Sequence, residues 1–215
     1  MLERQIHLVR HGEVYNPEGV LYGRLPGFRL SELGELMAES VRDNLQERGR
    51  KVSGVIASPL LRAQQSAAPI AKAFDLPVQT DPRIIEPSNQ FEGLVKHGPA
   101  GEMRKLRHLP KLWNPLLPSW GEPYARIARR VLAAMDDAWE QQPSDGDAVL
   151  VSHQAVIWAA HRAVNGLPLF HNPAQRRCDL SSITSFTKRD GSWFEVCYSS
   201  PAEPLLSGAK DVGAV

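Results

Sequence analysis

The stretch Ile6–Gly12 reads IHLVRHG, a run of strand-forming residues that ends in a cation, an imidazole and a glycine. Isoleucine, leucine and valine favour a buried strand, and the glycine marks the turn that follows it. Ligands of open α/β sheets bind outside the carboxyl ends of the strands, which is where this pattern puts Arg10 and His11. The stretch therefore predicts a strand that leads into a ligand site. Taken alone, Arg-His-Gly also fits an ordinary strand end with an incidental histidine.

Size and composition predict one domain. The chain has 215 residues, of which 42% are hydrophobic, and this is enough to bury a single full core. We expect that domain over residues 1–200, with a lid-like insertion at about 87–121 where prolines and glycines flank a basic cluster. Residues 201–215 are rich in Gly, Ala and Pro, which predicts a frayed tail.

The charge balance and the cysteine count restrict the partners and the compartment. Lys and Arg total 25 against 24 Asp and Glu, a formal net charge of +1, so no overall field favours nucleic acid or an acidic membrane surface. The N-terminus does not show the pattern of a signal peptide, and no apolar run approaches the ~20 residues of a membrane span. We therefore expect a cytoplasmic protein without nucleic-acid or membrane partners, in which Cys178 and Cys197 stay reduced.

Strand and helix patterns alternate along most of the chain, which predicts parallel strands joined by helices. After the first strand, strand patterns recur at 52–57, 77–80 and 148–151, and helical periods cover 31–48, 58–70, 121–139 and 155–165. The last two strand patterns, 180–187 and 193–198, flank an Asp190-Gly191 turn, so an antiparallel hairpin is expected at one edge of the sheet. The expected fold class is α/β, with a mainly parallel open sheet and an antiparallel edge strand.

Two later strands repeat the arrangement of the first. Arg62 follows the second strand, in the first turn of a helix that Ser58 and Pro59 introduce. Free amide groups and the helix dipole favour an anion there, and a guanidinium adds bidentate donors. His153 directly follows the strand that precedes the last helix. The alternatives are a solvated helix residue for Arg62 and a helix cap for His153.

In this order the motifs resemble the histidine phosphatase superfamily, also called phosphoglycerate mutase-like. The resemblance covers residues 5 to about 165 and is carried by Arg10-His11-Gly12, Ser58–Ala63 (SPLLRA), Glu86 and Ser152-His153. Leu30–Gly34 (LSELG) also looks like the family's Leu-Thr-x-x-Gly helix start, and Ser66-Ala67 trails the Arg62 motif. We therefore expect the properties of that family.

The resemblance implies a three-layer α/β/α sandwich and phosphoryl transfer through a phosphohistidine, with neither metal nor cofactor. On the matching positions His11 would be the nucleophile and Glu86 the proton donor to the leaving oxygen. Arg10, Arg62 and His153 would form the phosphate pocket. These residue types suit the chemistry, because cations disfavour protonation of the imidazole and hold the phosphoryl oxygens that Mg²⁺ holds in other enzymes. A carboxyl group among anionic oxygens has a raised pKa, which suits a general acid.

Further candidates lie beside these motifs. Asn16 and Arg24 in the long loop after the first strand, and Gln154, which replaces the glycine that usually follows the second histidine, are predicted to bind phosphate or substrate. The loop that holds Asn16 is one residue shorter than is common in the family. The segment after Glu86 is also compressed, so Glu92 is an alternative acid.

The expected substrate is a small phosphorylated metabolite, and two reactions compete. Family mutases carry arginines for the substrate carboxylate soon after the acid, whereas Pro87–Gln90 (PSNQ) offers none, which favours a phosphomonoester hydrolase over a phosphoglycerate mutase. Arg104, Lys105 and Arg107 would be substitutes under the mutase alternative. A non-catalytic binder of phospho-ligands is a third interpretation, and the apolar edge hairpin makes a homodimer conceivable.

Overall fold

The computed structural model describes residues 2–95 and 121–211. Most of the predicted insertion, with Arg104, Lys105 and Arg107, lies outside the described residues. The flanks of the insertion are described, and Asn89 and Gly121 meet there in an isolated antiparallel bridge. The two ends of that segment therefore lie side by side.

A six-stranded sheet forms the centre of the fold, in the order β3-β2-β4-β1-β5-β6. The strands are β1 (Ile6–Arg10), β2 (Val52–Ala57), β3 (Val78–Thr80), β4 (Asp147–Ser152), β5 (Ile183–Arg189) and β6 (Ser192–Ser199). The four strands from β3 to β1 pair in parallel, whereas β5 runs antiparallel to both β1 and β6. The predicted mainly parallel sheet with an antiparallel edge is confirmed.

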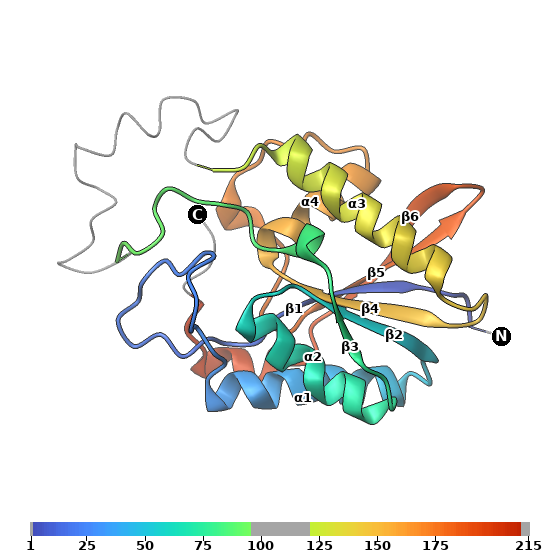
Figure 1. Ribbon diagram of the computed structural model, residues 1–215, viewed down its shortest axis with the longest axis horizontal. Coiled ribbons are helices and arrows are strands. Elements are labelled where there is room, and N and C mark those ends of the chain that lie inside the picture. The colour runs from blue at the N-terminus through green and yellow to red at the C-terminus, as the bar shows by residue number, and fades with distance from the viewer. Residues whose placement is uncertain (1, 96–120, 212–215) are drawn as a thin grey trace.

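Helices cover both faces of this sheet, which gives three layers. They are α1 (Glu32–Glu47), α2 (Leu61–Ala73), α3 (Tyr124–Gln141) and α4 (Gln154–Val164). Figure 1 shows α3 and α4 on one face of the sheet and α1 and α2 on the other. The three-layer α/β/α sandwich is therefore confirmed. No helix in the described parts of the chain is long and apolar enough to cross a membrane.

The central strands send alternate side chains to the two faces, because successive residues of a strand point in opposite directions. Ile6 and Leu8 of β1 belong to the same hydrophobic cluster as Val131 of α3. Val9 of β1 faces the other side, in a cluster with Val41 of α1. Strand β4 is buried along its whole length, as expected of a parallel strand covered on both faces. The side chains that follow β1 and β4 thus stand on a rigid base.

Helix α2 begins later than the local pattern predicts. The pattern makes Ser58 the N-cap, but Leu60 is the cap residue and makes no side-chain cap bond. The Ser58 hydroxyl oxygen accepts from the Leu60 amide at 3.5 Å, and it lies closer, 2.7 Å, to Nε2 of His153. A contact with a distant part of the chain thus uses the hydroxyl that the local pattern assigns to capping.

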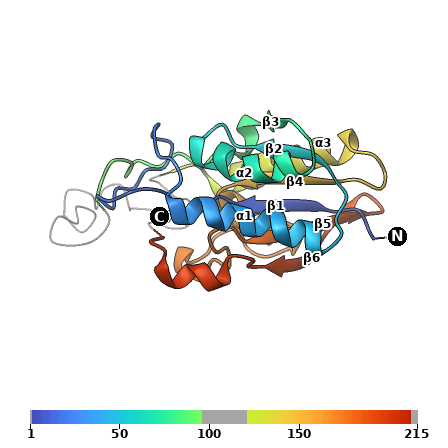
Figure 2. The ribbon, with the colours of Figure 1, turned by 90° about the horizontal axis from the view of Figure 1, so that it is seen from below.

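The C-terminal segment is packed in its described part, so the prediction of a frayed tail is wrong for residues 201–211. Glu203–Gly208 forms a 3-10 helix. Its side chains Leu205 and Leu206 pack against the hydrophobic cluster that contains Met37 of α1. Figure 2 shows this short helix beside α1. Two adjacent leucines give no periodic pattern, which is why composition alone misleads here.

The edge hairpin exposes apolar side chains on β6. Phe194 and Val196 are 47% and 41% exposed. Cys197 on the same strand and the buried Cys178 are both free thiols. The homodimer that these apolar residues suggest stays a prediction.

Candidate active site

Two adjacent parallel strands bring the two candidate histidines together. β1 and β4 pair with Arg10 opposite Ser152, and the His11 amide donates to the Ser152 carbonyl over 3.1 Å. Each strand therefore places its next residue, His11 or His153, at the same edge of the sheet. The centroids of the two imidazole rings are 5.3 Å apart.

The turn after His11 requires a glycine because the start of α1 passes against it. A Cβ atom on Gly12 would lie 2.3 Å from the carbonyl oxygen of Gly34, and one on Gly34 would lie 2.1 Å from the carbonyl oxygen of Glu13. The Gly12 amide also donates to the Ser66 hydroxyl of α2 over 3.1 Å. The glycines of the Arg-His-Gly and Leu-Ser-Glu-Leu-Gly motifs thus allow the two backbone segments to pack directly against each other.

The hydrogen bonds of His11 assign its tautomer. Nδ1 lies 2.8 Å from the Gly12 carbonyl oxygen, which can only accept, so Nδ1 carries the proton. Nε2 accepts a hydrogen bond from Nε of Arg62 at 3.2 Å. The Nε2 lone pair is therefore directed towards a guanidinium, on the side where an anion would bind.

The surroundings of His11 keep its imidazole neutral. Burial lowers the pKa of His11 well below its usual range, and Arg62 and Arg10 lower it further because each disfavours another positive charge nearby. A neutral imidazole has a free lone pair and is nucleophilic. His11 is therefore in its nucleophilic form at neutral pH.

Arg62, the second residue of α2, reaches across the site. Its Nη2 atom donates to the Gly23 carbonyl over 2.8 Å and lies 3.3 Å from Nδ1 of His153. The guanidinium carbon lies 4.6 Å from the ring centroid of Tyr22, a cation–π contact. Burial raises the pKa of the Tyr22 hydroxyl to about 12, so it stays protonated. Arg62 is thus held by neutral groups, which leaves its charge available to an anion.

Arg10 is buried and engages a carboxylate from the C-terminal segment. Its Nη1 atom donates to the Cys178 carbonyl over 2.7 Å. Nη1 and Nη2 also donate to the two carboxylate oxygens of Asp211, over 2.8 and 2.7 Å. Burial by itself lowers the pKa of Arg10, but Asp211 outweighs it and the pKa is raised. A bidentate pair of this kind is the geometry in which a guanidinium also holds a phosphate.

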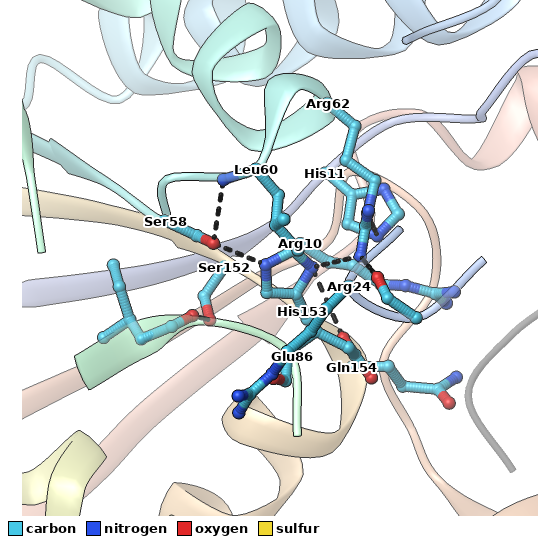
Figure 3. Close-up of polar contacts among 12 residues, drawn as sticks. Arg10, His11, Arg24, Ser58, Leu60, Arg62, Glu86, Ser152, His153 and Gln154 are labelled. Atoms are coloured by element: carbon cyan, nitrogen blue, oxygen red, sulfur yellow. Dashed lines mark hydrogen bonds and ion pairs between the residues drawn. The ribbon is translucent and has the colours of Figure 1, made fainter. Parts of the chain in front are cut away.

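His153 lies at the centre of the polar contacts (Figure 3). Its Nε2 atom faces the Ser58 hydroxyl, and Nδ1 lies 3.3 Å from both Nη2 of Arg62 and Oε2 of Glu86. Burial lowers the pKa of His153 well below its usual range, and Arg62 adds to that effect. The neutral ring donates from Nε2 to Ser58 and accepts from Arg62 at Nδ1.

Glu86 follows β3 and a 3-10 helix, Pro82–Ile84. Ser152 at the end of β4 anchors that helix by donating to the Ile84 carbonyl over 2.7 Å. Burial raises the pKa of the Glu86 carboxyl, although Arg62 and other arginines act in the opposite direction. A carboxyl group with a raised pKa can donate a proton near neutral pH.

A small cavity opens beside these side chains. Its free volume is about 30 Å³, which is space for one or two water molecules. The lining consists of Arg10, His11, Leu21, Tyr22, Gly23, Glu86, Pro87, Asn89, Glu92 and Gln154. A phosphoryl group therefore needs room that neighbouring groups now fill.

The remaining candidates differ in their placement. Gln154 and Glu92 line the cavity. Asn16 does not line it: its amide bonds both the N–H and the carbonyl of Val20, which closes the loop. Arg24 does not line it either, and donates from Nε to the Glu86 carbonyl over 2.6 Å. Neither Asn16 nor Arg24 thus lines this cavity, and Arg24 instead braces the loop that holds Glu86.

Four residues of the site are ones that the sequence pattern did not single out for it. Ser58 contacts His153, and Tyr22 contacts Arg62. Asp211 contacts Arg10, and Arg176 lies beside Gln154. Only Ser58 belongs to a recognised motif. The others come from segments without a local signal.

Sequence comparison finds relatives over most of the chain. Residues 6–200 match the model of the histidine phosphatase superfamily (branch 1). The uncharacterized protein Rv0525 of Mycobacterium tuberculosis is 48% identical over 201 residues, which are 93% of this chain and 98% of that one. A probable phosphoglycerate mutase, GpmB of Yersinia enterocolitica, is 32% identical over 191 residues, 83% of this chain and 84% of that one.

Solved structures share the fold. The mycobacterial glucosyl-3-phosphoglycerate phosphatase Rv2419c, in complex with inorganic phosphate, matches with a TM-score of 0.73 and 23% identity over 93% of this chain and 99% of that chain. A phosphoserine phosphatase mutant from Entamoeba histolytica matches with a TM-score of 0.72 and 20% identity over 92% of this chain and 98% of that one. With a family model that spans nearly its whole length and relatives at these identities, this chain belongs to the histidine phosphatase superfamily, branch 1.

Proposed function

We propose that this protein is a metal-independent phosphomonoester hydrolase that acts through a phosphohistidine on a small phosphorylated metabolite. The observation that carries the proposal is the pairing of a neutral His11, whose Nε2 lone pair faces Arg62, with a protonatable Glu86 at the same cavity. A nucleophile, a cation and an acid are the three groups that phosphoryl transfer to a histidine needs.

In the first step His11 Nε2 forms a bond to phosphorus while the bond to the alcohol oxygen breaks. Arg62 and Arg10 hold the phosphoryl oxygens, whose charge they balance in place of a metal ion. Glu86 gives its proton to the leaving oxygen, which would otherwise depart as a poor, basic alkoxide. The proton of His11 stays on Nδ1, which donates to the Gly12 carbonyl and so keeps the ring oriented.

In the second step water attacks the phosphohistidine. The Glu86 carboxylate, left unprotonated by the first step, takes a proton from that water. Phosphate leaves, and His11 returns to its neutral form with Glu86 protonated. The cycle closes without any outside acid or base.

The mutase alternative has its own support, because relatives about one third identical are named probable phosphoglycerate mutases. A mutase needs cations that keep the acid product bound after transfer, and neither of the cavity-lining residues just after Glu86, Pro87 and Asn89, is cationic. We favour hydrolysis for that reason. The fate of 3-phosphoglycerate separates the two.

The test is turnover of p-nitrophenyl phosphate and of 3-phosphoglycerate in the presence of excess EDTA. We expect both rates to stay within about twofold of the rates without EDTA, because arginines rather than a metal ion balance the charge of the phosphoryl oxygens. The expected product from 3-phosphoglycerate is free phosphate. Formation of 2-phosphoglycerate, with or without added 2,3-bisphosphoglycerate, would establish the mutase, and loss of activity in EDTA would rule out the metal-independent route. If no phosphomonoester is turned over, the non-catalytic binder of phospho-ligands is the interpretation that remains.

A further inference from the structure

Beside the cavity lies a buried guanidinium whose hydrogen-bond partners among the described residues are all neutral. Arg176 is 9% exposed and donates from Nε to Nε2 of His171 over 2.9 Å. Its Nη1 atom lies 3.5 Å from Oε1 of Gln154, and the Tyr124 hydroxyl is a third partner. Burial lowers the pKa of His171 to about 4, so that ring is neutral as well. The charge of Arg176 is therefore not balanced by any of the groups that hold it.

The other buried arginines show how unusual this is. Arg10 pairs with Asp211 and Arg50 pairs with Asp147, in each case through two hydrogen bonds. Buried charges are normally paired in this way, because an unpaired one carries the full cost of desolvation. Within residues 2–95 and 121–211, the buried arginines without a carboxylate in ion-pair contact are Arg62 and Arg176. Arg62 is the one that the proposed function assigns to an anion.

Arg176 lies on the side of the site where Glu86 is. Its charge acts on Glu86, where it is second only to Arg62 among the charges that lower the pKa of the acid. Gln154, the residue that Nη1 approaches, lines the cavity together with Glu86. The alcohol part of a substrate must lie next to Glu86, since that is where its oxygen receives the proton. A group on that alcohol would therefore come within reach of Arg176 and Gln154.

We propose that Arg176 and Gln154 form a subsite for a second oxyanion, a carboxylate or a phosphate, carried by the alcohol part of the substrate. The planar guanidinium accepts either group with two parallel hydrogen bonds. The amide of Gln154 adds a donor when the anion displaces its Oε1 contact. This subsite rests on the proposed function, and it narrows the substrate class to phosphomonoesters with a second negative charge.

Matched substrate pairs test the subsite. Phosphoserine has one carboxylate that phosphoethanolamine lacks. In the second pair, 3-phosphoglycerate has a carboxylate where glycerol 3-phosphate has a hydroxymethyl group. Fructose 1,6-bisphosphate and fructose 1-phosphate form the phosphate arm. We expect wild type to prefer the more anionic member of at least one pair by roughly 10- to 100-fold in kcat/KM, the size of a charge-assisted contact. The pair that shows the preference identifies the anion.

Variants locate the preference on Arg176. Arg176→Gln is expected to reduce it to less than about threefold, mainly through KM, because the contact is made to a non-reacting part of the substrate. Arg176→Lys keeps the positive charge but loses the planar pair of guanidinium donors, and it is expected to retain part of the preference. Arg177→Gln is the matched control, since Arg177 is the next residue but is exposed and pairs with Glu195.

The outcomes separate the subsite from the proposed function. If Arg176→Gln lowers kcat/KM equally for both members of every pair, Arg176 tunes Glu86 and the subsite is refuted. The same holds if wild type hydrolyses phosphomonoesters but shows no preference within any pair. If Arg176→Gln does not fold, as thermal melting would reveal, Arg176→Lys and Gln154→Ala decide the matter with the same substrate pairs. Failure of wild type on all phosphomonoesters would instead refute the proposed function.

An independent observation concerns the partner of Arg10. The Asp211 carboxylate takes both Nη atoms of Arg10, and the cavity beside them has room for one or two water molecules. Asp211 is 40% exposed, and its segment is anchored by the bond from the Lys210 amide to Glu13. A carboxylate thus holds the donors that a phosphoryl group needs.

We infer that Asp211 is an internal competitor for the phosphate site, which the substrate displaces. Inorganic phosphate is the probe, as a competitive inhibitor of p-nitrophenyl phosphate turnover. Asp211→Asn and Asp211→Ala are expected to lower its inhibition constant by roughly two- to fivefold, as for loss of a partly exposed ion pair. Glu203→Gln removes the same charge from an exposed position of the same segment and is the control. If both Asp211 variants leave phosphate binding unchanged or weaken it, Asp211 only positions Arg10 and the inference is wrong.

Discussion

Replacing His11 by alanine is expected to lower kcat/KM for every phosphomonoester by roughly 10⁴- to 10⁶-fold, as for loss of a nucleophile elsewhere. The reason is structural, because the Nε2 atom of His11 carries the lone pair that faces Arg62. Nε2 of His153 is committed to Ser58. Among the described residues of the site, no second imidazole is therefore free to take over. Steady-state kinetics with p-nitrophenyl phosphate measure the loss.

The same variant separates catalysis from folding and binding. Arg10 and Arg62 remain in His11→Ala, so inorganic phosphate should still bind, as calorimetry would show. His161→Ala is the matched control, because His161 lies on α4 and pairs with Glu195 outside the cavity. Rapid quenching of wild type with a ³²P-labelled substrate should trap acid-labile label on the peptide that contains His11. Label on the peptide of His153, or more than about 1% residual activity in His11→Ala, would contradict the assignment of the nucleophile.

Replacing Glu86 by glutamine is expected to depend strongly on the leaving group. For alkyl phosphates we expect a loss of roughly 10²- to 10⁴-fold in kcat, the usual contribution of a general acid. For p-nitrophenyl phosphate, whose phenolate leaves without protonation, the loss in the first step should stay below about tenfold. Pre-steady-state bursts distinguish that step from the hydrolysis of the phosphohistidine, which Glu86 also assists.

Glu92→Gln is the matched control for Glu86, because Glu92 lines the same cavity. Its Oε1 atom accepts from the amides of Arg24 and Asn89 at 3.1 and 3.4 Å, so the carboxylate is already engaged with backbone donors. We expect little dependence on the leaving group in this variant. If the two variants exchange their behaviour, Glu92 is the acid.

The pH profile carries the same information. Burial raises the pKa of Glu86 above its usual 4.5, so kcat/KM for alkyl phosphates should fall as the pH rises through that raised value and the proton is lost. Burial and two arginines lower the pKa of His11 well below 6.5, so the acidic limb, where the nucleophile is protonated, should lie well below pH 6.5. Glu86→Gln should abolish the basic limb and leave the acidic one in place.

The placement of Arg10, His11, Arg62, Glu86 and His153 at one edge of the sheet could be anticipated, because each lies at or after the carboxyl end of a strand in its parallel part. Carboxyl ends of parallel strands meet at one edge, so residues far apart in sequence are neighbours without any detailed knowledge of packing. The loop residues behave differently. Asn16 looked equally suitable by type and position, yet its amide satisfies the backbone of Val20, and no periodic pattern records such a local choice.

The sequence by itself determined the succession of strands and helices along the chain and the sheet edge at which the polar motifs meet, because hydrophobic period and turn residues are local properties. The three layers came from the family resemblance. Only the tertiary structure decided which charges balance one another there. Arg10 meets Asp211 from 201 positions away, and Arg176 stands among neutral partners. Whether a charge is paired depends on desolvation and on atoms brought together by packing, and neither is written in a local pattern.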